Sequence, residues 1–204
     1  MAEILYEAIP SLDLADFTSN DPNKKSDFVK QLGEAYNNIG FVAIRNHYLT
    51  NQLSDGLYTA IKNFYALPDA AKQKYEIPDL AGQRGYIGKF KEHAKGRNTG
   101  DLKEFYHVGQ EVLDDDPIKK EYPDNVWPDE VPGFKEVALD VYRRLEKTGI
   151  HMLRAISLYL NLPEKYFDDK VHHGNSILRP IHYFPIEDPD SVPEDAVRAA
   201  EHGD

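Results

Sequence analysis

The segment Gly133–Asn161, GFKEVALDVYRRLEKTGIHMLRAISLYLN, decides the fold together with the later segment Ile177–Phe184, ILRPIHYF. In the first segment apolar residues recur every three or four positions, which predicts one long amphipathic helix. The second is short and rich in Ile, Tyr and Phe, as strands are. A long helix followed by strands favours an α+β protein, in which a helix-rich N-terminal region leads into a mainly β region.

Upstream of the long helix, the pattern predicts a strand, a helix, a strand and a second helix. Ile9–Leu14 alternates between apolar and polar residues, which is typical of an edge strand. Helical spacing follows from Phe28 to Ile39 and again from Leu53 to Tyr65. Between these helices, Phe41–Ile44 contains four apolar residues in a row, which predicts a strand buried on both faces.

The middle of the chain is expected to be less regular. Pro78–Gly100 contains five Gly and five Lys or Arg, so we expect an exposed, flexible lid or flank of a substrate entrance. Asp101–Gly109 returns to strand character. Asp69 is a candidate cap for the turn that follows it, and Leu162–Phe167 is expected to form a short helix with Pro163 in its first turn.

Composition limits the classes of function. The 204 residues carry a formal net charge of −11, which disfavours nucleic acids and anionic membrane surfaces as partners. The absence of Cys excludes disulfides, thiolate nucleophiles and iron–sulfur clusters. No apolar run is long enough to span a bilayer, and the N-terminus lacks the features of a signal peptide. We therefore expect a cytoplasmic protein in which any metal is held by His and carboxylates.

The candidate metal ligands are His202 and Asp204, in the triplet His202-Gly203-Asp204. Residues two apart on an extended strand point to the same face, so an imidazole nitrogen and a carboxylate oxygen can reach one ion. With a third, distant His they form the facial triad of non-haem Fe(II) oxygenases. The alternative is a polar, frayed terminus, because a triplet this short also arises by chance.

Several landmarks in order resemble one family, the isopenicillin N synthase-like branch of the Fe(II)- and 2-oxoglutarate-dependent oxygenases. They are Ile9-Pro10 with Asp13, Gly40-Phe41 to Asn46-His47, Phe64 to Pro68 with Lys72, Arg84-Gly85-Tyr86, Asp101 with Lys103-Glu104, Asn125 to Pro128, Pro132-Gly133-Phe134, Leu178-Arg179 with Tyr183-Phe184-Pro185, and His202-x-Asp204. Val42 and Tyr48 depart from the family pattern.

The resemblance implies a double-stranded β-helix, or jelly-roll, core of which the chain holds the first strands. It divides the chain into an N-terminal dioxygenase region (1–132), a long helix with a short one (133–175) and the opening strands of the core (176–204). It also implies that His202 and Asp204 bind Fe(II), with 2-oxoglutarate and O₂ as co-substrates and a small organic molecule as substrate. The third His and the Arg-x-Ser pair of most members are absent from these 204 residues, so we expect the chain alone to be inactive and poorly soluble.

Arg179 and Tyr183 are the candidate residues for binding substrate or co-substrate. They share one parity along the strand, so both can face one cavity. A core or rim position for Tyr183 and a surface salt bridge for Arg179 remain open as alternatives. The alternative function is a non-catalytic, truncated relative that acts as an interaction module. The oligomeric state is not predicted.

Overall fold

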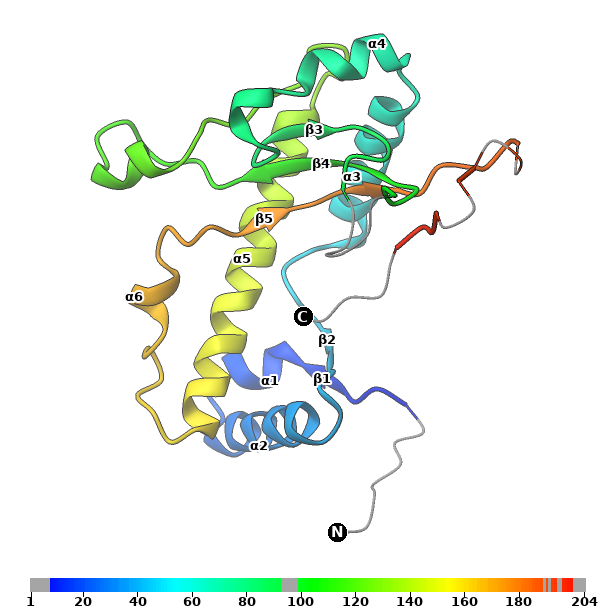
Figure 1. Ribbon diagram of the computed structural model, residues 1–204. Helices are drawn as coiled ribbons and strands as arrows, with labels where there is room; N and C mark the ends of the chain where they lie inside the picture. Colours follow the sequence, from blue (N-terminus) through cyan, green and yellow to red (C-terminus); the bar gives the residue numbers. More distant parts are fainter. Residues whose placement is uncertain (1–7, 93–98, 189, 191, 194–195, 200–204) are drawn as a thin grey trace. The chain divides into compact units, whose positions relative to one another are not determined.

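The computed structural model describes residues 8–92, 99–188, 190, 192–193 and 196–199 (Figure 1). His202 and Asp204 lie outside these residues, as does the stretch 93–98 of the expected lid. The chain divides into two compact units that interleave along the sequence: residues 1–54 with 143–174, and residues 55–142 with 175–204. The division into three regions, which follow one another along the sequence, stays a prediction. Within the described part of the chain, no helix is long and apolar enough to cross a membrane.

The first unit contains a short parallel sheet and helices. Its elements are β1 (Ser11–Asp13), α1 (Leu14–Thr18), α2 (Pro22–Ile39), β2 (Ala43–Arg45), the C-terminal part of α5 (Phe134–Tyr159) and α6 (Asp168–Val171). Helix α2 is capped by Asp21, whose carboxylate accepts the Asn23 backbone N–H at 2.9 Å. It ends at Ile39, and the residue after it, the C-cap Gly40, adopts the left-handed conformation, with φ of 76°.

Two expectations for the first unit are wrong. Strand β2 is not buried on both faces, since Ala43 is exposed and Phe41, just before the strand, is 67% exposed. It pairs with β1 alone in a two-stranded sheet, and of its apolar residues Ile44 packs against the core of the unit while Ala43 does not. The short helix expected at Leu162–Phe167 is a series of turns, and α6 begins after it, at Asp168.

The second unit contains helices and an antiparallel sheet. Its elements are α3 (Asn51–Tyr65, whose first four residues belong to the first unit), α4 (Asp69–Lys72), three short 3₁₀ turns (Gln73–Tyr75, Pro78–Leu80, Pro117–Glu121), β3 (Gly85–Ile87), β4 (Glu104–Gly109), the first turns of α5, β5 (Ile177–Leu178) and β6 (Ile181–His182). Strand β4 pairs with β3, β5 and β6 (Figure 1). Asp69 begins α4 without capping it: the N-cap is Pro68, and the Asp69 carboxylate pairs with Lys72.

An aromatic cluster forms the core of the second unit. Phe64, from α3, is fully buried, and four of its neighbours approach it edge-on, Tyr106 at a centroid distance of 5.0 Å. Edge-to-face pairs of this kind stabilise a core beyond the area that they bury. The cluster backs one face of β4 and so holds that strand in place.

The expectation that Pro78–Gly100 is an exposed lid is wrong for residues 84–88, which are buried, whereas Pro78, Asp79, Ala81 and Gln83 are exposed. Gly85, Tyr86 and Ile87 form β3, are buried, and pair with His107, Tyr106 and Phe105 of β4. A strand of three residues is too short to show periodicity, and its partner lies 18 or more residues away. The Gly-rich composition therefore concealed a buried strand.

Gly85 is required at the start of β3. Its φ is +78°, and an added Cβ would lie 2.4 Å from the Tyr75 carbonyl oxygen. We expect Gly85→Ala to lower the free energy of unfolding by about 2–5 kcal/mol, since the left-handed conformation and overpacking both add strain. Gly149→Ala is the matched control, because nothing lies within 4 Å of its added Cβ in α5; it should raise stability by up to about 1 kcal/mol. Chemical denaturation measures both, and equal stabilities for the two variants would contradict the expectation.

Candidate active site

Strand β4 has two chemically different faces, and its pairing places the expected substrate residues on one of them. Glu104 lies opposite His182, and Phe105 lies opposite Ile181. Because paired residues of antiparallel strands share a face, Glu104 and His182 point one way, toward the aromatic core, and Phe105 and Ile181 the other. Arg179 contacts the second face. We call the surface formed by Phe105, His107, Arg179 and Ile181 the arginine face.

Arg179 is held on the arginine face by three neighbours. Its Nε donates to Nε2 of His107 at 2.6 Å, and its Nη1 lies 3.1 Å from the Glu92 carboxylate. The guanidinium carbon stands 4.5 Å from the centroid of the Phe105 ring. The side chain is 39% exposed, so it is fixed in position and still accessible, which suits a group that binds an anion.

These contacts support both interpretations of Arg179. The accessible guanidinium suits a substrate-binding residue, and the partly exposed pair with Glu92 is the surface salt bridge that was the alternative. Tyr183 follows β6 at the parity of Arg179 and Ile181 and is 43% exposed. The structure describes no hydrogen bond from Tyr183 to another described residue. The two candidates therefore share a side of the strand without a described contact between them.

The opposite face of β4 carries a buried polar cluster that sequence reasoning missed. The Glu104 carboxylate, 1% exposed, accepts hydrogen bonds from Lys72 at 2.8 Å, Tyr86 at 2.5 Å and His182 Nδ1 at 2.8 Å. Asp69 gives Lys72 a second carboxylate at 3.0 Å. Lys72 and Glu104 belong to two separate landmarks of the sequence, and no local pattern reveals a pair 32 positions apart.

Electrostatics in this cluster favour a charged Glu104. Burial alone would raise the pKa of its carboxyl group, but hydrogen bonds from Lys72, Tyr86 and His182 outweigh burial and hold the pKa below its usual value. Burial raises the pKa of Tyr86, and its bond to Glu104 adds to that effect, so the phenol stays neutral and donates. The cluster is a fully bonded ion pair that joins α4, β3, β4 and β6.

A cavity of about 560 Å³ lies on this side of the sheet. Lys72, Glu104 and His182 are among its polar lining residues, together with four more charged side chains, and Phe90, Phe184 and Ile186 are among its apolar ones. Neither Arg179 nor Tyr183 lines it. Tyr65 stacks on His182 with ring centroids 4.9 Å apart and lines the cavity too.

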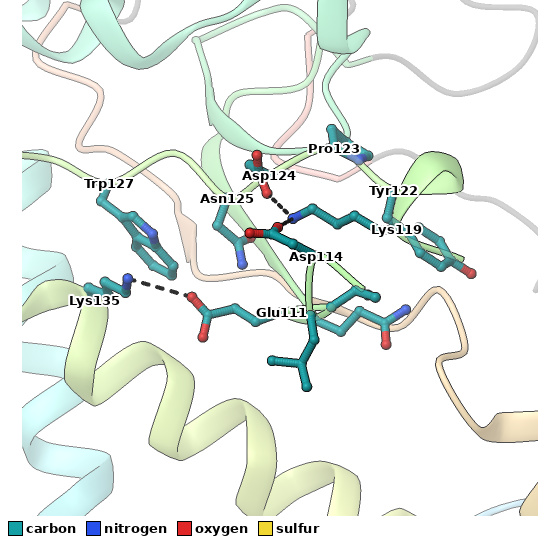
Figure 2. Close-up of a pocket in the computed structure, with 12 residues that line it drawn as sticks. Glu111, Asp114, Lys119, Tyr122, Pro123, Asp124, Asn125, Trp127 and Lys135 are labelled. Atoms are coloured by element: carbon teal, nitrogen blue, oxygen red, sulfur yellow. Dashed lines mark hydrogen bonds and ion pairs between the residues drawn. The ribbon is translucent and has the colours of Figure 1, made fainter. Parts of the chain in front are cut away.

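A second hollow, of about 370 Å³, lies beside the loop after β4 (Figure 2). Lys119 pairs there with Asp114 and Asp124, and Lys135 lies 3.6 Å from Glu111 and near the Trp127 ring. Since each of these lysines already has a carboxylate partner, neither is an unmatched cation for an anionic ligand. None of the expected site residues lines the hollow.

The metal assignment depends on residues beyond those that the structure describes. Among the described residues, no group of three or more His, Asp and Glu side chains is placed to hold a metal ion. His172 and His173 are adjacent, with ring centroids 4.0 Å apart, and belong to no such group. His202 and Asp204 supply nitrogen and oxygen donors of the kind that Fe(II) accepts.

Comparison with known proteins decides the family. The family model for the non-haem dioxygenase in morphine synthesis, N-terminal region, matches residues 9–130. The chain belongs to the non-haem Fe(II)- and 2-oxoglutarate-dependent dioxygenases. It is 32% identical over 218 residues to the 2-oxoglutarate-Fe(II) type oxidoreductase ppzD of Metarhizium rileyi, covering 100% of this chain and 60% of that protein. It is 34% identical to the 2-oxoglutarate-dependent dioxygenase htyE of Aspergillus rugulosus, covering 97% and 61%.

Solved structures of the family support the fold. A 2OG-Fe(II) oxygenase family protein from Caulobacter crescentus matches with a TM-score of 0.78 at 34% identity, over 91% of this chain and 59% of that one. A full-length protein from Neurospora crassa, solved in complex with alpha-KG, matches with a TM-score of 0.78 at 26% identity, over 96% and 61%. The expected α+β dioxygenase fold is confirmed. The dioxygenase chain spans about three fifths of the length of the curated relatives it matches.

Proposed function

We propose that the intact protein couples decarboxylation of 2-oxoglutarate and activation of O₂ to oxidation of a small organic molecule. The observation that carries this proposal is the match to the 2-oxoglutarate-Fe(II) oxidoreductase ppzD, which extends over 100% of the chain and so includes His202-x-Asp204. The relatives' names favour oxidation over the non-catalytic interaction module. The outcome of the oxidation, whether hydroxylation, cyclisation or desaturation, depends on the substrate.

In this proposal His202 and Asp204 hold Fe(II), which supplies O₂ activation when it is bound. The chain's own residues bind and orient the organic molecule. Arg179 contributes a fixed, accessible guanidinium, held by His107 and Glu92. Tyr183 lies four positions further along, with a half-exposed ring and a phenol that is a hydrogen-bond donor.

The partners and location follow in the same way as proposals. We infer a small-molecule substrate rather than a nucleic acid, because a net charge of −11 repels a polyanion. The absence of Cys from these 204 residues is consistent with the reducing cytoplasm.

The test of the function is oxygen consumption by the intact protein with a panel of small acids and amides. We expect O₂ uptake to require both Fe(II) and 2-oxoglutarate, and to yield succinate in equal amount. Uptake that is independent of 2-oxoglutarate would contradict the proposal.

The test of Arg179 uses the compound that stimulates uptake most. Arg179→Ala should raise the KM for that compound about tenfold or more, because a charged hydrogen bond is lost. Arg45→Ala, at an exposed position of β2, is the matched control and should leave KM unchanged. Equal KM values for the two variants would remove Arg179 from the substrate site.

A further inference from the structure

His107 lies between a backbone carbonyl and the side chain of Arg179. Its Nδ1 is 2.6 Å from the carbonyl oxygen of Gly82, and its Nε2 is 2.6 Å from Nε of Arg179. The imidazole packs on Phe105, with ring centroids 4.8 Å apart, and is 7% exposed. Both ring nitrogens are therefore used, and bulk water has little access to either.

These two contacts define the protonation state of the imidazole. A carbonyl oxygen only accepts hydrogen bonds, so Nδ1 carries the proton and donates it to Gly82. The Nε of arginine only donates, so Nε2 of His107 presents its lone pair to Arg179. An imidazolium would place two N–H groups against each other across 2.6 Å. The geometry therefore requires the neutral Nδ1–H tautomer.

The groups around His107 shift the pKa of its imidazole in both directions. Burial lowers the pKa of the imidazole below its ordinary value. The hydrogen bond to Gly82 and the carboxylate of Glu92 oppose that shift, whereas the cations Arg179 and Arg84 reinforce it. The pKa lies below the usual value on balance, in agreement with the tautomer that the contacts require.

One nitrogen of the Arg179 guanidinium, Nη2, is available to bind a ligand. His107 occupies Nε, Glu92 is bonded to Nη1, and Phe105 packs against the guanidinium plane. Among the described residues, Nη2 has no hydrogen-bond partner. Glu92 is itself held by Lys103 at 2.7 Å, so its charge is shared between two cations and does not fully neutralise Arg179.

We propose that His107 is a positioning residue: as a neutral imidazole it holds Arg179 so that Nη2 receives a carboxylate of the substrate. The proposal rests on the assignment of Arg179 to the substrate site under the proposed function. It adds the residue that orients Arg179 and the chemical class of the group that is bound. Protonation of His107 withdraws the acceptor from Nε and releases the guanidinium.

The first experiment is ¹⁵N NMR of the histidine and arginine side chains in the purified protein, without iron or 2-oxoglutarate. We expect His107 to show a protonated Nδ1, an unprotonated Nε2, and a coupling between Nε2 and Nε of Arg179 across the hydrogen bond. The Arg179 Nε–H signal should be lost as the pH falls through the pKa of His107. The opposite tautomer, or an Arg179 signal that ignores this titration, would overturn the proposal.

The second experiment compares His107→Gln with His107→Phe. The Gln amide oxygen replaces the Nε2 lone pair and does not titrate, whereas Phe keeps a ring and offers no acceptor. Acetate is the carboxylate probe and acetamide its neutral counterpart, with binding followed by ¹³C NMR at the guanidinium Cζ of Arg179, a signal that does not depend on the Nε–H proton. We expect the wild type and the Gln variant to bind acetate alike, the Phe variant to bind it about tenfold more weakly, and acetamide to bind none of them.

These outcomes are separate from those of the proposed function. Equal acetate affinity in the Gln and Phe variants would overturn the positioning role, and equal binding of acetamide would overturn the carboxylate assignment. Acetate binding needs no turnover. A lack of 2-oxoglutarate-dependent oxygen uptake would therefore refute the proposed function, whereas the role of His107 is decided by the acetate affinities of the Gln and Phe variants.

Discussion

Glu104→Ala should lower the free energy of unfolding by about 3–5 kcal/mol, among the largest effects of any single substitution in the second unit. Removal of one partner of a buried ion pair leaves the other charge without compensation. Lys72 would retain only Asp69, whose side chain is 64% exposed, and the hydrogen bonds from Tyr86 and His182 would lose their acceptor. Chemical denaturation should show a lower midpoint with an unchanged slope.

Two controls separate this ion pair from ordinary surface charge. Glu111→Ala removes a partner of Lys135 at 3.6 Å, with both side chains substantially exposed, and should cost less than about 1 kcal/mol. Replacing Lys72 and Glu104 together by Met and Leu should recover the part of the loss that comes from the uncompensated Lys72 charge, while Tyr86 and His182 still lack their acceptor. A loss below about 1 kcal/mol in Glu104→Ala would contradict the buried-pair account.

The same carboxylate contributes to the pH dependence of stability. The pKa of Glu104 is lower in the folded protein than in the unfolded chain, so the folded state binds fewer protons in this range. The contribution of Glu104 to the stability of the fold is therefore complete at pH values above the usual carboxyl pKa. It is lost as the pH falls through the lower pKa that Glu104 has in the folded protein. Glu104→Gln should flatten this part of the curve of stability against pH, which thermal unfolding at a series of acidic pH values would measure.

Elements with a long periodic pattern were predictable from the sequence. The helix expected at Gly133–Asn161 is α5, Phe134–Tyr159, and the helix from Leu53 to Tyr65 is α3, Asn51–Tyr65. The strand expected at Ile177–Phe184 is present as β5 and β6, divided near Pro180. Proline has no N–H for the ladder, but the carbonyl of Pro180 accepts bonds from the backbone of Tyr106 and the hydroxyl of Tyr65.

The polar contacts were not predictable, because they join residues far apart in the sequence. His107 and Arg179 are separated by 72 positions and meet through the pairing of β4 with β5 and β6. Glu104 occupies a strand position where a carboxylate is unfavourable unless donors surround it, and those donors come from α4, β3 and β6. The burial of Glu104 is therefore a property of the tertiary fold and leaves no local pattern.

Substitution of either expected metal ligand should have the largest effect on activity. Removal of a residue that only hydrogen-bonds to a metal ligand typically lowers metal affinity by roughly 10–100-fold. In the intact protein, His202→Ala and Asp204→Ala each remove a ligand itself and should reduce iron affinity by more than that. Oxygen uptake should then be lost, because an ion held by fewer ligands is neither retained nor oriented. His172→Ala is the matched control, a histidine outside any described metal-binding group.

The assignment of His202 and Asp204 as iron ligands is tested by the iron content of the intact protein and its variants, determined side by side with 2-oxoglutarate-dependent oxygen uptake. We expect about one iron per chain and full uptake in the wild type and His172→Ala, with both lost in His202→Ala and Asp204→Ala. Full iron and full uptake in either ligand variant would contradict the assignment.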